Sequence, residues 1–281
     1  MARGLSVHVG LNEVDPAHYN GWDGALAACQ ADAEDMEALA RSRGFETTKL
    51  LTREATADAI KAAIGKAAEE LEAGDILFVS YSGHGGQVPD TNGEEETDSS
   101  DETWLAYDRQ IVDDELFALW TGFMPGVRII VLSDSCHSGS VNKNIEEPVP
   151  DPVATAEEAA KQEPRYRALP RDTMIATYRA NEELYDGIQR AVPSSTSSTE
   201  DLGARVLLIS GCQDDQLSRD GIKNGAFTGK LLEVWDDGAW RGGYPEFHEA
   251  IRSRMPDDQQ PNFNPVGAEN PEFDRQDPFT V

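Results

Sequence analysis

The sequence predicts an α/β fold with one open, mostly parallel sheet of about six principal strands and helices on both faces. Short runs rich in β-branched and aromatic residues alternate along the chain with segments whose apolar residues recur every three or four positions. The chain has 281 residues, of which 39% are hydrophobic and 27% charged, so it is long enough for one sizeable core. We therefore expect a single domain over residues 1–281.

The first half of the chain is expected to contain four strands and three helices. The strands are residues 4–11 and the stretches "FETTKLL", "DILFVSYSGHGG" and "GVRIIVLSDSCHSG". Apolar spacing predicts a helix over residues 24–43, which Gly44 ends. A second helix is expected from a Thr56 cap to Gly74, and a third begins at "DDELFALW".

The second half begins with a change in composition. Residues 141–170 hold prolines and charges with little apolar content, so we expect a long, mobile surface loop. A helix near 172–190 and a Ser/Thr-rich linker follow, then a buried strand in "ARVLLISGCQ", helices in "GAFTGKLLEVW" and "YPEFHEAIRSRM", and a closing strand near "QPNFNPVG". The domain is thus expected to comprise a part up to residue 140, an insertion over 141–200 and a part over 201–281.

Charge and cysteine content narrow the class of protein. The 52 acidic and 24 basic residues give a net charge of -28, which argues against nucleic-acid binding and favours cationic ligands or substrates, although surface acid also serves solubility or life in high salt. Cysteines at positions 29, 136 and 212 form neither a disulfide framework nor a CxxC zinc motif. With no signal-peptide pattern and no apolar stretch of ~18 residues, a cytoplasmic monomer without membrane contact is expected.

Two candidate catalytic side chains each follow a predicted parallel strand. His84 comes just after "DILFVSYS", and Cys136 comes just after "GVRIIVLSD". Because ligands bind beyond the carboxyl ends of the strands in open α/β sheets, we expect these two side chains to meet at one site. A cysteine that attacks a carbonyl needs a thiolate and a proton donor for the leaving amine, and an imidazole serves both needs. The amides of Gly85 and Cys136 are expected to form an oxyanion hole.

The motif "YSGHGG", followed about fifty residues later by "DSCHSG", resembles the caspase-like cysteine peptidases, specifically the metacaspases and their prokaryotic relatives. Further similar elements are "LAACQADAEDM", "DETWLAYD", "IVDDEL", "LISGCQDDQ" and "GAFT", which together extend over most of the chain apart from residues 141–170. The resemblance implies a caspase-like fold in which His84 is the general acid/base and Cys136 the nucleophile.

The resemblance also implies a specificity pocket built from Cys29, Asp32, Ser82 and Asp134, which receives Arg or Lys at the position before the cut. Such a pocket is chemically reasonable because a buried guanidinium must be paired and suits bidentate carboxylates. Asp134 lies two residues before Cys136, and side chains two apart on a strand share a face. The pocket is therefore expected to adjoin the nucleophile.

An acidic stretch, "TNGEEETDSSDE", indicates a second site. Many metacaspases are calcium-activated, and the resemblance implies a Ca2+ site at Asp98, Asp113 and Asp114. Carboxylates are the hard oxygen ligands that calcium takes, although the spacing is not that of an EF-hand. No cofactor is expected for the chemistry itself, and Ca2+ is expected only as an activator.

Several of these residues have a purely structural alternative. Cys136 taken alone fits a small buried hydrophobe, and Cys29 lies on the apolar stripe of its predicted helix. Asp113 and Asp114 fit the charged N-terminus of a helix as well as they fit a metal site. His137 is expected to point away from the side of Cys136, because neighbours on a strand face opposite ways.

Other functions also have to be weighed. A catalytically silent caspase-like module that binds basic peptides as an adaptor is one alternative, against which the intact His84 and Cys136 speak. An α/β-hydrolase needs a small-x-nucleophile-x-small elbow, whereas Asp134 stands two residues before the cysteine, and the separate downstream His248 lies in a predicted helix. A nucleotide-binding loop is disfavoured because "SGHGGQ" lacks GxGxxG spacing and a Walker lysine.

The resulting prediction is a cysteine endopeptidase that cuts protein or peptide substrates after Arg or Lys. Its own insertion holds five basic residues that fit that specificity and are candidate autoprocessing sites: Lys143, Lys161, Arg165, Arg167 and Arg171. The helix near 172–190 is a candidate cover of the active site before activation.

Overall fold

The computed structural model describes residues 2–91, 100–136, 165–192, 202–213 and 216–281. Its centre is a six-stranded sheet in the order β2-β1-β3-β7-β8-β9. Five of these strands are parallel, and β9 pairs antiparallel with β8 at one edge. The predicted open, mostly parallel sheet is confirmed. Its strands are β1 (Gly4–Gly10), β2 (Glu46–Leu51), β3 (Ile76–Ser82), β7 (Arg128–Asp134), β8 (Arg205–Ser210) and β9 (Asn262–Gly267).

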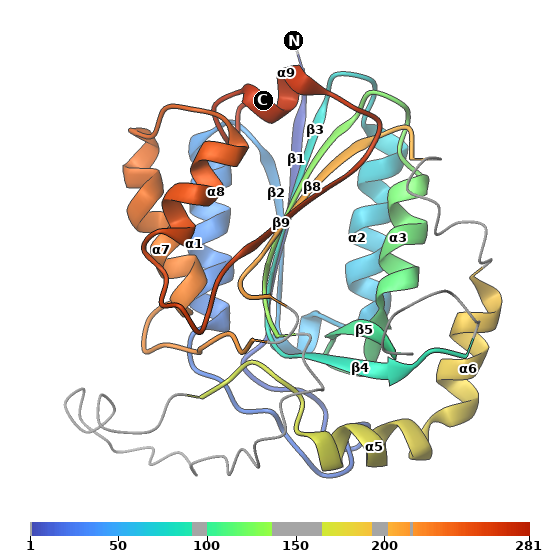
Figure 1. Ribbon diagram of the computed structural model, residues 1–281. Helices are drawn as coiled ribbons and strands as arrows, with labels where there is room; N and C mark the ends of the chain where they lie inside the picture. Colours follow the sequence, from blue (N-terminus) through green and yellow to red (C-terminus); the bar gives the residue numbers. More distant parts are fainter. Residues whose placement is uncertain (1, 92–99, 137–164, 193–201, 214–215) are drawn as a thin grey trace.

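Helices cover both faces of this sheet (Figure 1). One face carries α1 (Cys29–Ser42), α7 (Ala226–Trp235) and α8 (Tyr244–Arg252), and the other carries α2 (Ala57–Glu70) and α3 (Asp113–Thr121). Strand β7 shows how two cores arise, because Ile129 and Val131 belong to the core under α2 and α3, whereas Ile130 and Leu132 belong to the opposite core. Three short helical segments complete the two layers: η1 (Thr52–Glu54), η4 (Asp236–Gly238) and α9 (Pro271–Arg275).

A second, smaller sheet lies at the carboxyl ends of the central strands. It is antiparallel and contains β4 (Gly85–Pro89), β5 (Ser100–Leu105) and β6 (Gln110–Val112). Helices α5 (Arg171–Ala180) and α6 (Glu182–Ala191) run past this end of the molecule (Figure 1). The carboxyl ends of the central strands are therefore surrounded by the small sheet and by helices α5 and α6.

The structure corrects three of the predicted elements. The helix expected over 24–43 begins at Cys29, since the chain first crosses the end of the sheet and Gly24 takes a positive φ of 58°. The helix expected near 172–190 is two helices, because the backbone leaves the helical region at Asn181 (φ -128°, ψ 23°). The end of the acidic stretch is strand β5 rather than loop.

A fourth correction concerns the predicted surface loop over 141–170. Residues 137–164 lie outside the described residues, as does His137. Residues 165–170 are described, and they are not a surface loop, because Arg167 is fully buried and Leu169 is 4% exposed. The prediction from composition was wrong here because Arg167 is paired with carboxylates inside the protein, and composition alone places a charged residue at the surface.

The predicted cap of the second helix is confirmed. Thr56 caps α2, since its side-chain oxygen accepts a hydrogen bond from the Ala59 amide. In the part of the chain that the structure describes, every helix is too short or too polar to span a lipid bilayer.

Candidate active site

Neighbouring strands bring the candidate dyad to one edge of the sheet. In the parallel pairing of β3 with β7, Ser82 lies opposite Asp134, and these are the last residues of the two strands. His84 and Cys136 each follow two residues later. The same register thus places both side chains just beyond the carboxyl ends of adjacent central strands.

His84 is buried, and its two ring nitrogens have different surroundings. Nε2 lies 3.0 Å from the carbonyl oxygen of Gly24. Burial lowers the pKa of His84 to about 4, and the hydrogen bond with the Gly24 backbone partly opposes that shift. The ring is therefore neutral at pH 7 with its one proton on Nε2, because a carbonyl oxygen can only accept. Nδ1 has no hydrogen-bond partner among the described residues and is left as a base.

The loop after β1 fixes the orientation of His84. The Trp22 ring packs on the imidazole with centroids 4.7 Å apart. A Cβ added at Gly24 would come within 3.2 Å of His84 Cδ2 and 3.0 Å of the Trp22 ring. Glycine is thus required at position 24 both for its positive φ and for close packing against the imidazole.

Residues 165–169 enter the site in an extended conformation. The carbonyl oxygen of Arg167 accepts hydrogen bonds from the amides of Gly85 (3.0 Å) and Cys136 (3.1 Å), the two amides expected to form an oxyanion hole. The Arg167 amide donates to the Ser218 carbonyl at 2.9 Å. Ser218 also contacts the nucleophile candidate, since its own amide donates to Cys136 Sγ. The peptide bond between Arg167 and Ala168 therefore lies directly at Cys136.

The backbone of this segment pairs with the segment around Arg219 before Arg167 and with the start of β4 after it. Before Arg167, the carbonyl of Arg165 accepts from the Asp220 amide at 2.8 Å, and Tyr166 forms an antiparallel bridge with Arg219. After Arg167, the Leu169 amide donates to the Gly85 carbonyl at 2.8 Å. Such pairing is the way in which an extended peptide is added to a sheet edge.

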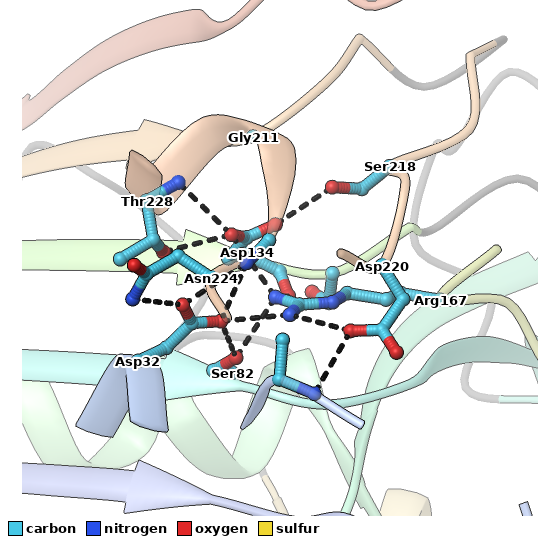
Figure 2. A network of polar contacts seen from close by, with 12 residues as sticks. Asp32, Ser82, Asp134, Arg167, Gly211, Ser218, Asp220, Asn224 and Thr228 are labelled. Atoms are coloured by element: carbon cyan, nitrogen blue, oxygen red, sulfur yellow. Dashed lines mark hydrogen bonds and ion pairs between the residues drawn. The ribbon is translucent and has the colours of Figure 1, made fainter. Parts of the chain in front are cut away.

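The Arg167 side chain fills an acidic pocket (Figure 2). Its Nη2 lies 2.7 Å from Asp32 Oδ2 and 3.0 Å from Asp220 Oδ1, and its Nη1 lies 3.0 Å from Asp134 Oδ2. Nη1 also donates to Ser82 Oγ at 2.8 Å. The side chains of all three carboxylates are at most 2% exposed, so one guanidinium is the shared partner of three buried acids.

The pocket carboxylates are held in place by polar neighbours (Figure 2). Asp32 accepts hydrogen bonds from Ser82 Oγ and from the Gly225 amide, and Asp134 accepts from both the amide and the hydroxyl of Thr228. Burial raises the pKa of Asp32, while Arg167 opposes that shift. Burial acts to lower the pKa of Arg167, but the carboxylates, Asp134 foremost, outweigh it and raise that pKa, so the guanidinium is charged.

Six of the predicted site residues lie together around the Arg167–Ala168 bond: Ser82, His84, Gly85, Asp32, Asp134 and Cys136. Cys29 lies next to Ser82 at the start of α1, and its burial raises the pKa of its thiol.

The sequence interpretation missed three parts of the pocket: Ser218, Asp220 and Gly225. The motif "GAFT", noted for its resemblance, contains Gly225 and Thr228 and was the available signal for that wall. No pattern marked Ser218 or Asp220, because the segment before the motif has no regular secondary structure.

The predicted calcium ligands are not brought together by the described residues. Asp113 and Asp114 lie in the first turn of α3, where carboxylates interact favourably with a helix N-terminus, and Asp98 lies outside the described residues. Within the described ranges, no group of three or more His, Cys, Asp and Glu side chains is placed to hold a metal ion.

Known protein families and proteins are similar to this chain over most of its length. Residues 14–279 match the model of the caspase domain family. Metacaspase-1 of Mycosarcoma maydis is 30% identical over 239 residues, which are 75% of this chain and 58% of that protein. Metacaspase-4 of Arabidopsis thaliana is 30% identical over 48% of this chain and 34% of its own length. The chain therefore spans about a third to three fifths of the length of these relatives.

Two crystal structures resemble the whole fold. A protein from Geobacter sulfurreducens is 51% identical, with a TM-score of 0.87 and 99% of each chain covered. Caspase-1 from Spodoptera frugiperda is 13% identical, with a TM-score of 0.52 over 94% of this chain and 86% of its own, and shows the fold alone. With the caspase-domain match over nearly its entire length, this chain belongs to the caspase family of cysteine peptidases and has metacaspases among its relatives.

Proposed function

We propose that this protein is a cysteine endopeptidase that cuts after arginine, with His84 and Cys136 as its catalytic dyad. One observation carries the proposal: an arginine of the chain itself fills a buried acidic pocket while its carbonyl oxygen accepts from two amides beside Cys136. A peptidase must hold its substrate in this arrangement for acyl transfer, with the side chain before the cut in a pocket and the carbonyl on fixed donors.

The proposed chemistry uses the two side chains that follow β3 and β7, with the Arg167–Ala168 bond as the model of the substrate. His84 Nδ1 takes the thiol proton of Cys136, and the sulfur attacks the carbonyl carbon after the arginine. Negative charge develops on the carbonyl oxygen, where the amides of Gly85 and Cys136 stabilise it. His84 then gives its proton to the leaving amine as the C–N bond breaks. Water, deprotonated by His84, hydrolyses the thioester and regenerates the thiol.

The pocket favours arginine over lysine. Arg167 Nη2 is shared by Asp32 and Asp220, while Nη1 reaches Asp134 and Ser82, so three carboxylates surround the two nitrogens. A lysine ammonium is a single point charge and lacks the planar fork that contacts these carboxylates together. We expect lysine peptides to be cleaved at least tenfold more slowly.

The same placement supports autoprocessing at the Arg167–Ala168 bond. Five basic residues of the insertion were candidates; Lys143 and Lys161 lie outside the described residues, and of Arg165, Arg167 and Arg171 it is Arg167 that occupies the pocket. The helices after 170 do not supply the blocking residue, because the segment in front of α5 enters the site.

The test uses fluorogenic peptides ending in Arg, Lys or Asp, together with mass spectrometry of the full chain. Turnover of the Arg peptide and fragments 1–167 and 168–281 are expected from the wild type and not from Cys136→Ala. Asp peptides should remain uncleaved, because the pocket is acidic. If folded wild-type protein neither turns over Arg peptides nor processes itself, the adaptor alternative, a silent module that binds basic peptides, replaces the peptidase.

We further propose calcium stimulation through Asp98, Asp113 and Asp114, and action as a monomer in the cytoplasm. The support for calcium is the acidic stretch and the adjacent carboxylates at the start of α3. Adding Ca2+ after chelation should raise turnover of the Arg peptide in the wild type. The paired substitution Asp113→Asn and Asp114→Asn should remove that rise while leaving turnover in chelator unchanged, and an unaltered calcium response would refute the assignment.

A further inference from the structure

An apolar pocket lies on the far side of the Arg167–Ala168 bond from the acidic one. Leu169, the second residue after that bond, is 4% exposed and packs with three buried residues from two other parts of the chain: Val14, Tyr19 and Leu105. Trp22 and Met174 close its rim. The walls are rigid, since the Tyr19 hydroxyl donates to the Ala106 carbonyl at 2.9 Å and Leu105 lies in β5.

The backbone delivers this side chain to the pocket in a fixed register. Gly85 donates to the Arg167 carbonyl and accepts from the Leu169 amide, so a single residue holds the peptide on both sides of the Arg167–Ala168 bond. Gly86, next in β4, leaves room for the leucine, because a Cβ there would lie 3.3 Å from Leu169 Cβ and 3.3 Å from Leu105 Cδ1. A peptide bound in this register must place its second residue after the cut at these walls.

The pocket also adjoins the catalytic imidazole. Trp22, on its rim, packs on the ring of His84. Between the two pockets, the small side chain of Ala168 is buried against Cys136 and Cys212. The first residue after the cut therefore meets two closely packed cysteines, and the second meets the apolar cluster.

We propose that the enzyme selects its substrates on both sides of the cut: arginine before it, a small residue directly after it, and a large aliphatic residue in second place after it. The proposal rests on the proposed peptidase function and extends it to the substrate class. Val14, Tyr19 and Leu105 are the specificity-determining residues, and Leu169 occupies their pocket as the chain's own substrate residue.

The first experiment needs no catalytic activity. In the Cys136→Ala background, trypsin cleavage after Arg167 is followed by N-terminal sequencing of the fragment that begins at Ala168. Leu169→Asp should accelerate this cleavage at least tenfold, because the segment loses its apolar contacts, whereas Leu169→Met should stay within about threefold of the parent. Leu184→Asp is the matched control, since Leu184 lies in α6 and is 42% exposed. Equal rates for Leu169→Asp and Leu184→Asp would show that the pocket does not hold the segment.

The second experiment measures selection by the wild-type enzyme. Two quenched peptides carry Tyr-Arg-Ala-Leu or Tyr-Arg-Ala-Asp around the cut, and a fluorogenic Arg reporter has no amino acid after it. The leucine peptide should be cleaved with at least a tenfold higher kcat/KM than the aspartate peptide. Equal values, or turnover of the reporter with cleavage of neither peptide, would overturn the proposal. Absence of reporter turnover would instead count against the peptidase function, and the trypsin experiment would still decide whether the apolar pocket binds Leu169.

Discussion

At the residue scale, Gly225 shapes the acidic pocket. A Cβ at this position would lie 2.5 Å from Asp134 Oδ2 and 2.6 Å from both Cζ and Nη1 of Arg167. We predict that Gly225→Ala lowers kcat/KM for Arg peptides at least a hundredfold and suppresses autoprocessing, because the new methyl group takes the space of the guanidinium. Steady-state kinetics with the fluorogenic Arg peptide measures the effect.

A second glycine of the same region provides the control for that prediction. Gly229 lies inside α7, and a Cβ there would meet only Asn224 Cβ, at an ordinary 3.7 Å. Gly229→Ala should retain activity and stabilise the helix by up to about 1 kcal/mol, because alanine has the higher helix propensity. Equal activities of the two variants would show that the wall at position 225 does not limit the pocket.

Arg167 also shows why part of the site could not be predicted from sequence. His84, Cys136 and Asp134 are found by motif and by their place at strand ends, and Asp32, in the first turn of α1, is found by its motif alone. Whether an arginine among five basic residues of a polar segment becomes buried depends on carboxylates contributed by α1, β7 and the segment before α7. Burying the arginine costs free energy, and only carboxylates that are distant in the sequence and close in the fold offset that cost.

At the scale of elements, the strands that sequence predicted well are those buried on both faces. β3 and β7 each contain a run of four consecutive apolar residues and are buried along almost their whole length. Such a run predicts a buried strand without help from distant parts of the chain. Strand β4 was missed because it begins with Gly85 and Gly86, which resemble a loop when read alone. Its strand character comes from pairing with β5, a contact that local sequence does not encode.

His8 makes strand β1 sensitive to acid. It lies in the middle of the central sheet, fully buried, with its ring nitrogens 2.8 Å and 2.9 Å from the hydroxyls of Ser80 and Ser6. Burial, with a contribution from Lys49, lowers its pKa from 6.5 to about 3. As pH falls below about 6.5, the unfolded chain therefore binds a proton that the folded chain does not, and stability is lost progressively towards the folded-state pKa.

We predict that His8→Gln removes this acid-sensitive contribution. Each pH unit within the window costs about 1.4 kcal/mol, so between pH 7.5 and 5.0 the wild type should lose about 2 kcal/mol more than the variant. Urea unfolding at the two pH values, with Cys136→Ala in both proteins to prevent processing, measures the difference. Parallel losses of stability in the two proteins would contradict the assignment of this effect to His8.

At the scale of the whole molecule, the net charge of -28 opposes folding, because a compact chain brings like charges together. Exposed ion pairs such as Arg3 with Glu46 act in the opposite direction, but each contributes little because water and salt screen the attraction between exposed charges. The buried cluster around Arg167 is shielded from solvent ions and should respond little to salt.

These charge interactions predict that added salt stabilises the folded protein. Raising NaCl from about 0.01 M to about 0.1 M shortens the screening length from roughly 30 Å to roughly 10 Å, which weakens repulsion across the surface more than it weakens contacts at ion-pair distance. The thermal unfolding midpoint of Cys136→Ala should therefore rise, while trypsin cleavage after Arg167, corrected for the effect of salt on trypsin itself, stays constant. A falling midpoint would mean that surface ion pairs outweigh the excess acid, and salt-dependent exposure of Arg167 would mean that the acidic pocket is open to solvent.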